Sequence, residues 1–204
     1  RETWVELNNV VVIPNPLSIS PVEKSDLSKK RVIAVGRYCH EKGYDHLLQA
    51  WTIVQDKCPE WQLAIYADGD RTIYERMMGE LHIDSDRCLL NGRTSDVISE
   101  FLNSSFALCS SRFEGFGMVI AEAMACGLPV VSFDCPWGPR AIISDGEDGL
   151  LVENGNIDKL AEALIMIIQH PELRKAMADK AIENVQRFKM DQIAEKWKTL
   201  FEAL

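Results

Sequence analysis

The feature that most constrains the fold of this chain is the regular alternation of short apolar segments with single helical segments. The apolar segments are near-continuous rather than alternately polar, which is typical of strands buried on both faces of a parallel sheet. Six such strands are predicted, at residues 31–35, 61–67, 87–90, 105–109, 128–133 and 149–152. Since crossovers between parallel strands are right-handed, this pattern predicts an α/β fold, a doubly wound parallel sheet with the strand order 3-2-1-4-5-6.

Local signals add boundaries to this pattern. Val10 to Ile13 is predicted as a further short strand, stopped by Pro14-Asn15-Pro16. Thr94 and Asp191 are predicted to cap the helices that follow them. Two helices are characterised by apolar residues at helical spacing: Leu47, Leu48, Trp51 and Val54 in the first, and Ile73, Met77 and Leu81 in the second.

The chain divides into three parts. Residues 1–28 are predicted to be an N-terminal arm or interdomain connector, because a polar run from Ser18 to Lys30 precedes the first long strand. Residues 29–188 carry the sheet, and residues 189–204 form a last helix. The chain begins with Arg1 rather than Met, so we expect it to be a piece of a longer protein.

Composition excludes several classes of function. The net charge of −9 argues against a general binder of nucleic acid or of anionic membranes. No apolar run approaches the length of a membrane span, and no signal peptide is visible. The six cysteines form no C-x-x-C pair and the four histidines are not spaced as metal ligands, so we expect a cytoplasmic protein with reduced cysteines and no metal.

Two unusual loops follow strands that the predicted order makes neighbours. Residues 36–43 follow the first strand and residues 110–117 follow the fourth, so both loops are expected to face the crevice beyond the carboxyl ends of the strands. Cationic residues are rare in so acidic a chain, yet four follow the first, third and fourth strands: Arg37, Lys42, Arg93 and Arg112. Their position favours an anionic ligand, most simply a phosphate ester.

The second loop also introduces two carboxylates. Glu114 lies in a Gly-rich turn, and Glu122 is the only charge in the apolar helix from Val119 to Gly127. The turn Gly115-Phe116-Gly117 lets backbone amides approach a ligand closely, and the positive end of the helix dipole adds to their attraction for phosphate. Sugar hydroxyls would then suit the two glutamates. The alternative is structural: Glu114 caps the helix, and Glu122 is held by a distant arginine or by water.

Familiar nucleotide and hydrolase motifs are absent: no G-x-G-x-x-G follows the first strand, and no P-loop, H-E-x-x-H or G-x-S-x-G occurs. What is present is Gly36-Arg37 with Lys42-Gly43, then Glu114 and Glu122 separated by seven residues, then Gly127-Leu128-Pro129-Val130-Val131. These motifs, with an E-x7-E pair at their centre and the segment 145–152 matching D-G-x-x-G-x-L-V, resemble the retaining glycosyltransferases of family 4. That family has two Rossmann-like domains facing across a cleft, the GT-B arrangement.

The resemblance covers roughly residues 10–204 and implies that residues 29–188 are the Rossmann-like, nucleotide-sugar-binding C-terminal domain. Residues 189–204 would then pack toward an N-terminal domain that holds a glycan or lipid-linked acceptor, and the parent protein would be peripheral at the inner membrane face in polysaccharide biosynthesis. The expected reaction is metal-independent hexosyl transfer, with no cofactor and with a UDP-sugar or GDP-sugar as donor.

Roles follow from the resemblance position by position. Arg37 and Lys42 would neutralise the donor diphosphate, and Glu114 would accept hydrogen bonds from the donor sugar. Glu122 would bind the ribose hydroxyls. The turn and helix start would hold phosphate and sugar oxygens, through Gly115, Phe116, Gly117, Met118 and Val119. Arg93 and Thr94 would contact the base.

Departures from the family pattern leave alternatives open. The loop Cys135-Pro136-Trp137-Gly138-Pro139 replaces a Gly-Gly pair, and Arg140 stands where a glutamate is frequent. Trp137 would stack on a sugar or simply close the loop. A non-catalytic nucleotide-sugar-binding or scaffold module is the second hypothesis, and a hydrolysing sugar-nucleotide epimerase is a weaker third.

Overall fold

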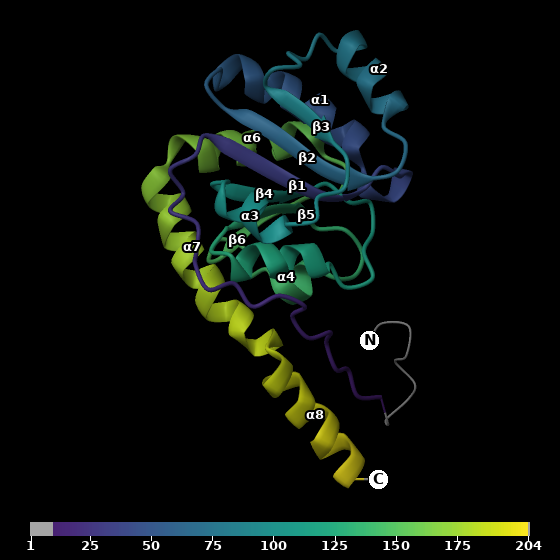
Figure 1. Ribbon diagram of the computed structural model, residues 1–204, viewed down its shortest axis with the longest axis vertical. Helices are drawn as coiled ribbons and strands as arrows, with labels where there is room; N and C mark the ends of the chain where they lie inside the picture. The colour runs from purple at the N-terminus through teal and green to yellow at the C-terminus, as the bar shows by residue number, and fades with distance from the viewer. Residues whose placement is uncertain (1–9, 204) are drawn as a thin grey trace.

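A six-stranded parallel sheet forms the centre of the protein in a computed structural model, which describes residues 10–203 (Figure 1). The strand order is β3-β2-β1-β4-β5-β6, and every neighbouring pair is parallel. The predicted doubly wound fold and its order are therefore confirmed. The strands are β1 (Arg31–Arg37), β2 (Gln62–Asp68), β3 (Cys88–Asn91), β4 (Phe106–Cys109), β5 (Val130–Phe133) and β6 (Gly149–Val152).

Helices cover both faces of the sheet and bury one apolar cluster on each side. Alternate residues of β1 supply both clusters, Val32 to one and Ile33 to the other, as the period of two in a strand requires. The first face is covered by α1 (Tyr44–Lys57), α2 (Thr72–Glu80) and α6 (Ile157–Gln169). The second is covered by α3 (Val97–Leu102), α4 (Met118–Ala125), α5 (Pro139–Ile142) and the C-terminal half of α7 (Pro171–Val185).

The apolar stripe predicted for α1 is confirmed, since all four of its residues are buried. In the second helix the prediction is right for Met77 and Leu81, which pack against the core, and wrong for Ile73. Tyr74 and Met78 are buried, whereas Ile73 is 59% exposed. Tyr74 joins Tyr38 and Tyr44 in an aromatic cluster with ring centroids 5.5–5.9 Å apart, and this packing sets the rotation of the helix.

Both predicted helix caps are wrong. Asp96 caps α3, because its side chain accepts a hydrogen bond from Ser99 N, while Thr94 accepts one from Asp96 N in the turn before it. Asp191 lies inside the first turn of α8 (Met190–Glu202), and Lys189 precedes that helix. The cap of α3 lies two residues after the predicted one, because the turn bonded by Thr94 precedes the helix. The first residue before α8 lies two residues before the predicted cap, directly after the 3-10 segment η3 (Gln186–Phe188).

The N-terminal arm is not a strand at residues 10–13, where Val11 and Val12 are exposed. A β-branched run forms a strand only when a neighbouring edge supplies its hydrogen bonds, and no described strand lies beside this segment. From residue 17 the arm is bonded to the domain: Leu17 N donates to Phe188 O, and Ser25 N to Cys126 O. Residues 1–9 of the predicted arm lie outside the described residues.

Candidate functional site

The loops after β1 and β4 contact each other closely, as their expected position in the crevice requires. The 3-10 segment η2 (His40–Lys42) ends at Gly43, whose φ of 62° lies in the left-handed region. A Cβ at Gly43 would stand 2.1 Å from Ser110 O, so only glycine permits this approach. Ser110 Oγ donates to Lys42 O at 2.8 Å, and Arg112 N donates to Glu41 O at 2.8 Å.

Arg112 reinforces the contact between these two loops. Its guanidinium forms a bidentate ion pair with Asp45 at the start of α1, with distances of 2.8 and 2.6 Å, and also donates to His40 O. Burial opposes ionisation of Asp45, but the hydrogen bonds and the positive charge of Arg112, with smaller contributions from His46 and a backbone amide, together outweigh it and hold the pKa of this carboxyl below its ordinary value. Arg112 is one of the four cations expected to favour an anionic ligand, and in the structure its guanidinium contacts Asp45 and His40 and so connects the two loops.

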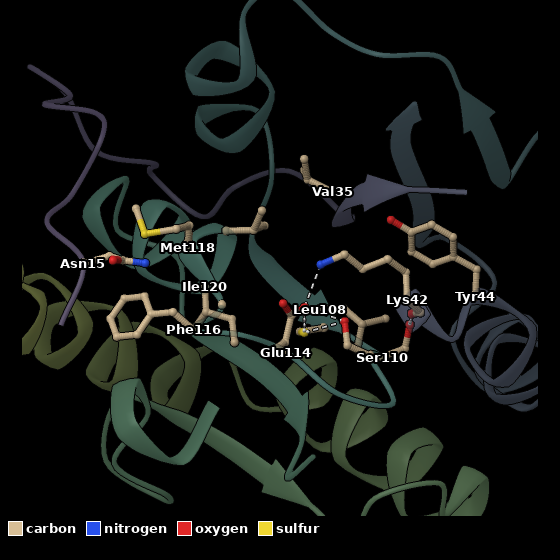
Figure 2. A pocket seen from close by; sticks show the side chains of 14 residues that line it. Asn15, Val35, Lys42, Tyr44, Leu108, Ser110, Glu114, Phe116, Met118 and Ile120 are labelled. Carbon is tan, nitrogen blue, oxygen red and sulfur yellow. Dashed lines mark hydrogen bonds and ion pairs between the residues drawn. The ribbon is translucent and has the colours of Figure 1, made fainter. Parts of the chain in front are cut away.

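A cavity of about 260 Å³ lies where β1, β4 and α4 meet (Figure 2). Lys42 reaches across it, and its Nζ lies 2.7 Å from Glu114 Oε1. Ser111 Oγ donates to the same carboxylate oxygen at 2.6 Å, and the Cys109 thiol lies 3.8 Å from it. Both members of the ion pair are largely shielded, with side chains 18% and 12% exposed, yet both line the open space. Glu114 therefore does not cap α4.

The first turn of α4 forms another wall of the cavity. Gly117, with φ of 91°, precedes the helix, and Met118 and Val119 follow it at the edge of the open space. Amides at a helix start have no partner within the helix and favour anions, so the position of this turn at the cavity is compatible with the predicted phosphate contacts. The Phe116 ring packs edge-on against Phe188, with ring centroids 5.5 Å apart. Gly115 is exposed, and a Cβ there would meet nothing within 4 Å, so packing does not require glycine at this position.

The remaining predicted site residues lie outside this cavity. Glu122 is one turn farther along α4, where the Ser18 hydroxyl of the arm donates to its carboxylate. This partner was not foreseen, since we had expected an arginine, water or a ligand. Arg37 is exposed at the end of β1, and its side chain forms no ion pair or hydrogen bond within residues 10–203. Arg93 and Thr94 follow β3 and do not line the cavity.

The loop after β5 rests on the Glu114 turn. Glu114 N donates to Pro136 O at 3.3 Å, and a Cβ at Gly138 would stand 2.4 Å from Phe116 O. Trp137 between them is half-exposed and has a φ of 65°, which is a strained conformation for a bulky residue. Arg140, at the position where a glutamate is frequent, pairs with Asp134.

Sequence reasoning placed the loop that contains Ser111 at the crevice without giving this residue a role, and it missed Asn15 and Tyr44 among the polar residues that line the cavity. Tyr44 precedes Leu47 and Leu48 by three and four positions, so helical spacing alone could have placed it on the buried face of α1. Ser111 precedes Glu114 by three residues within a turn, which is a short enough separation for a hydrogen bond. Asn15 belongs to the arm, and no sequence signal indicates where that arm crosses the domain.

Two further observations concern the described part of the chain. Within residues 10–203, no group of three or more His, Cys, Asp or Glu side chains is placed to hold a metal ion. None of the helices from α1 to α8 combines the length and the apolar character needed to cross a membrane.

The fold and the motifs around the cavity define a glycosyltransferase domain. Residues 18–184 match the family described as glycosyl transferases group 1, and the chain belongs to this family. The resemblance to glycosyltransferases inferred from the motifs is confirmed at this level.

Proteins of known sequence and structure extend this result. An uncharacterized glycosyltransferase of Haemophilus influenzae is 33% identical over 202 residues, covering 97% of this chain and 57% of that protein. The poly(glycerol-phosphate) alpha-glucosyltransferase of Bacillus subtilis is 28% identical over 171 residues, covering 83% of this chain and 25% of that protein. A mutant of S. aureus TarM, solved in complex with fondaparinux, alpha-GlcNAc-glycerol and UDP, superposes with a TM-score of 0.85 at 26% identity. The match covers 96% of this chain but only 40% of that one.

Proposed function

We propose that this chain is the donor-binding domain of a retaining, metal-independent glycosyltransferase. Such an enzyme transfers a hexosyl unit from a UDP-sugar or GDP-sugar to a glycan, lipid-linked or polysaccharide acceptor. One observation carries the proposal: Lys42 and Glu114 meet in a cavity beside the first turn of α4, in a chain that belongs to a glycosyltransferase family. The similar TarM structure, which contains UDP, supports a nucleotide as part of the donor.

The charges in the cavity suit the leaving group of sugar transfer. When the bond between the anomeric carbon and the diphosphate breaks, negative charge grows on the diphosphate oxygens, and a cation with helix amides stabilises it. Lys42 and the amides of residues 117–119 supply these groups, and Arg37 would approach from the surface. Lys42 is paired with Glu114, so a diphosphate would compete with this carboxylate for the lysine.

Glu114 and Glu122 are suited to hydroxyl groups. Glu114 already accepts a hydrogen bond from Ser111 Oγ, and Glu122 accepts one from Ser18 Oγ. A donor sugar at Glu114 and ribose at Glu122 would present hydroxyls of the same chemical type. Arg93 and Thr94, which follow β3, remain proposed contacts for the base.

The size of the cavity fits only part of a nucleotide sugar. Pockets for small ligands commonly measure roughly 300–1,000 Å³, so about 260 Å³ accommodates the diphosphate and sugar rather than the whole donor. A second domain would complete the site, exclude water from the reacting carbon and hold the acceptor. The chain spans only 25–57% of the relatives described above, in keeping with this division.

Calorimetric titration with UDP, GDP and ADP, and with their sugars, tests the proposal. We expect weak binding of one nucleoside diphosphate, and a loss of about tenfold or more in Lys42→Met, because a charge-assisted hydrogen bond contributes about 1.5–3 kcal/mol. Lys159→Met is the matched control, since it removes a lysine from a surface ion pair of similar length, 2.8 Å. Equal losses in both variants, or no binding of any nucleotide, would contradict the proposal, and rapid sugar transfer by this chain alone would contradict the need for a second domain.

A further inference from the structure

Tyr44, the first residue of α1, contributes a buried polar group to the cavity that the proposed function does not use. The side chain is only 2% exposed, and it lines the cavity beside Lys42. Its hydroxyl oxygen is buried and has no hydrogen-bond partner among residues 10–203. An unpaired buried hydroxyl is costly, so such a group normally has a partner in the working protein.

The position of this hydroxyl is set by two neighbours. A Cβ at Gly36 would stand 2.7 Å from the Tyr44 hydroxyl and 3.2 Å from Cδ and Cε of Lys42. Glycine at the end of β1 therefore leaves the space in which the tyrosine hydroxyl and the lysine side chain lie next to each other. Figure 2 shows the hydroxyl directed from α1 toward Val35, on the side of the cavity that Lys42 crosses.

The ring is held rigidly while its hydroxyl is left unpaired. Tyr38 and Tyr74 pack against it, with ring centroids 5.7 and 5.9 Å away. Burial raises the pKa of Tyr44 well above its ordinary value, so the hydroxyl remains protonated and is available as a donor. A rigid donor beside a lysine is complementary to an oxygen atom that carries negative charge.

We propose that Tyr44 is a ligand-binding residue whose hydroxyl donates a hydrogen bond to a phosphate oxygen of the nucleoside diphosphate held by Lys42. This inference rests on the proposed function and adds a specific contact to it. Lys42 Nζ is directed to Glu114, and the Tyr44 hydroxyl lies near the Lys42 side chain. When the diphosphate binds, its oxygens accept hydrogen bonds from both Lys42 Nζ and the Tyr44 hydroxyl. These bonds raise the affinity for phosphate over that for an uncharged ligand of the same size.

Tyr44→Phe isolates this hydroxyl, because the ring and its aromatic packing are kept. Tyr74→Phe is the control, since Tyr74 belongs to the same aromatic cluster but does not line the cavity. We expect the dissociation constant for the nucleoside diphosphate that the wild type binds, and for inorganic pyrophosphate, to rise about tenfold in Tyr44→Phe and to stay unchanged in Tyr74→Phe. The ligand-free midpoint of thermal unfolding should stay the same or rise, because an unpaired buried group has been removed.

Each other result has a distinct meaning. Unchanged affinity in Tyr44→Phe would overturn the inference while leaving the proposed function standing. Unchanged affinity in Tyr44→Phe together with a lower unfolding midpoint would overturn the inference as well. It would indicate that the hydroxyl forms a hydrogen bond with a bound water molecule. If the wild type bound neither the nucleotides nor pyrophosphate, the proposed function itself would fail, and Tyr44 with it.

Discussion

The crevice at the carboxyl edge of the sheet and the extension formed by α8 are organised in opposite ways. In the crevice, backbone contacts and the Arg112–Asp45 pair fix two loops around a charged cavity. In the extension, Ile193 is the only buried residue of a 13-residue helix, and α8 projects away from the sheet (Figure 1). Trp197 and Phe201 stack on each other at its surface, with Pro16 of the arm along the same groove.

The difference indicates which part of the chain is held in place by contacts among the described residues. Polar groups around Lys42 are mostly paired within the domain, so the crevice keeps its shape without further contacts. The exposed apolar residues of α8 are Met190, Trp197 and Phe201, an arrangement that is typical of an interaction surface. We therefore retain the proposal that residues 189–204 pack toward an N-terminal domain, and we expect mutations in the two regions to differ sharply in their effect on stability.

The largest effect is expected from Gly43→Ala, which breaks the crevice at its closest contact. The new Cβ would stand 2.1 Å from Ser110 O, and the residue would have to keep a φ of 62°. The two loops must separate, and we expect the free energy of unfolding to fall by about 2–4 kcal/mol, in the range of severe steric and backbone strain. Urea denaturation measures this loss.

Gly115→Ala is the matched control for that experiment. A Cβ at Gly115 meets nothing within 4 Å, so its free energy of unfolding should change by less than about 0.5 kcal/mol. A fall in nucleotide affinity without a fall in stability would mark Gly115 as a point of close ligand approach. Equal stability of Gly43→Ala and the wild type would show that the loops are not fixed in the way described.

A smaller loss is expected from Asp45→Asn, which removes the carboxylate that holds Arg112. Hydrogen bonds to charged groups contribute about 1.5–3 kcal/mol, and partial exposure of both side chains favours the lower end, about 1.5–2 kcal/mol at pH 7. Because the folded pKa of Asp45 lies below its ordinary value of 3.8, this stabilisation is present above pH 3.8 and is lost as the pH falls through the folded pKa.

Unfolding measured at pH 7 and at pH 3 tests the sign of this effect. The difference in stability between the wild type and Asp45→Asn should be largest at pH 7 and should shrink on acidification. Asp56→Asn, an exposed position on the same helix with no ion pair within residues 10–203, should show no such trend. A stability difference between the wild type and Asp45→Asn that grows toward low pH would contradict the role assigned to the Arg112–Asp45 ion pair.

The sequence predicted the crevice better than the extension, for physical reasons. Strand order follows from local runs such as Val32 to Val35 together with the handedness of crossovers, and this order alone brings the Lys42 and Glu114 loops together. The role of Arg112 was not foreseen, because strand order brings the two loops together but does not specify that Arg112 pairs with Asp45 at the start of α1. Val10 to Ile13 failed as a strand because strand propensity does not specify a partner edge.

The smallest effect on stability is expected from the double variant Trp197→Ser, Phe201→Ser in α8. These side chains are 46% and 66% exposed and pack mainly on each other, so the free energy of unfolding should change by less than about 0.5 kcal/mol. Backbone amides of α8 beyond Ile193 should exchange with solvent much faster than those of β1 and β4, because few buried contacts hold this helix. Hydrogen exchange measured residue by residue decides whether α8 is a weakly held surface helix or part of the domain core. Slow exchange throughout α8, or a loss of stability as large as that in Gly43→Ala, would mean that the helix is part of the domain core rather than a surface prepared for another domain.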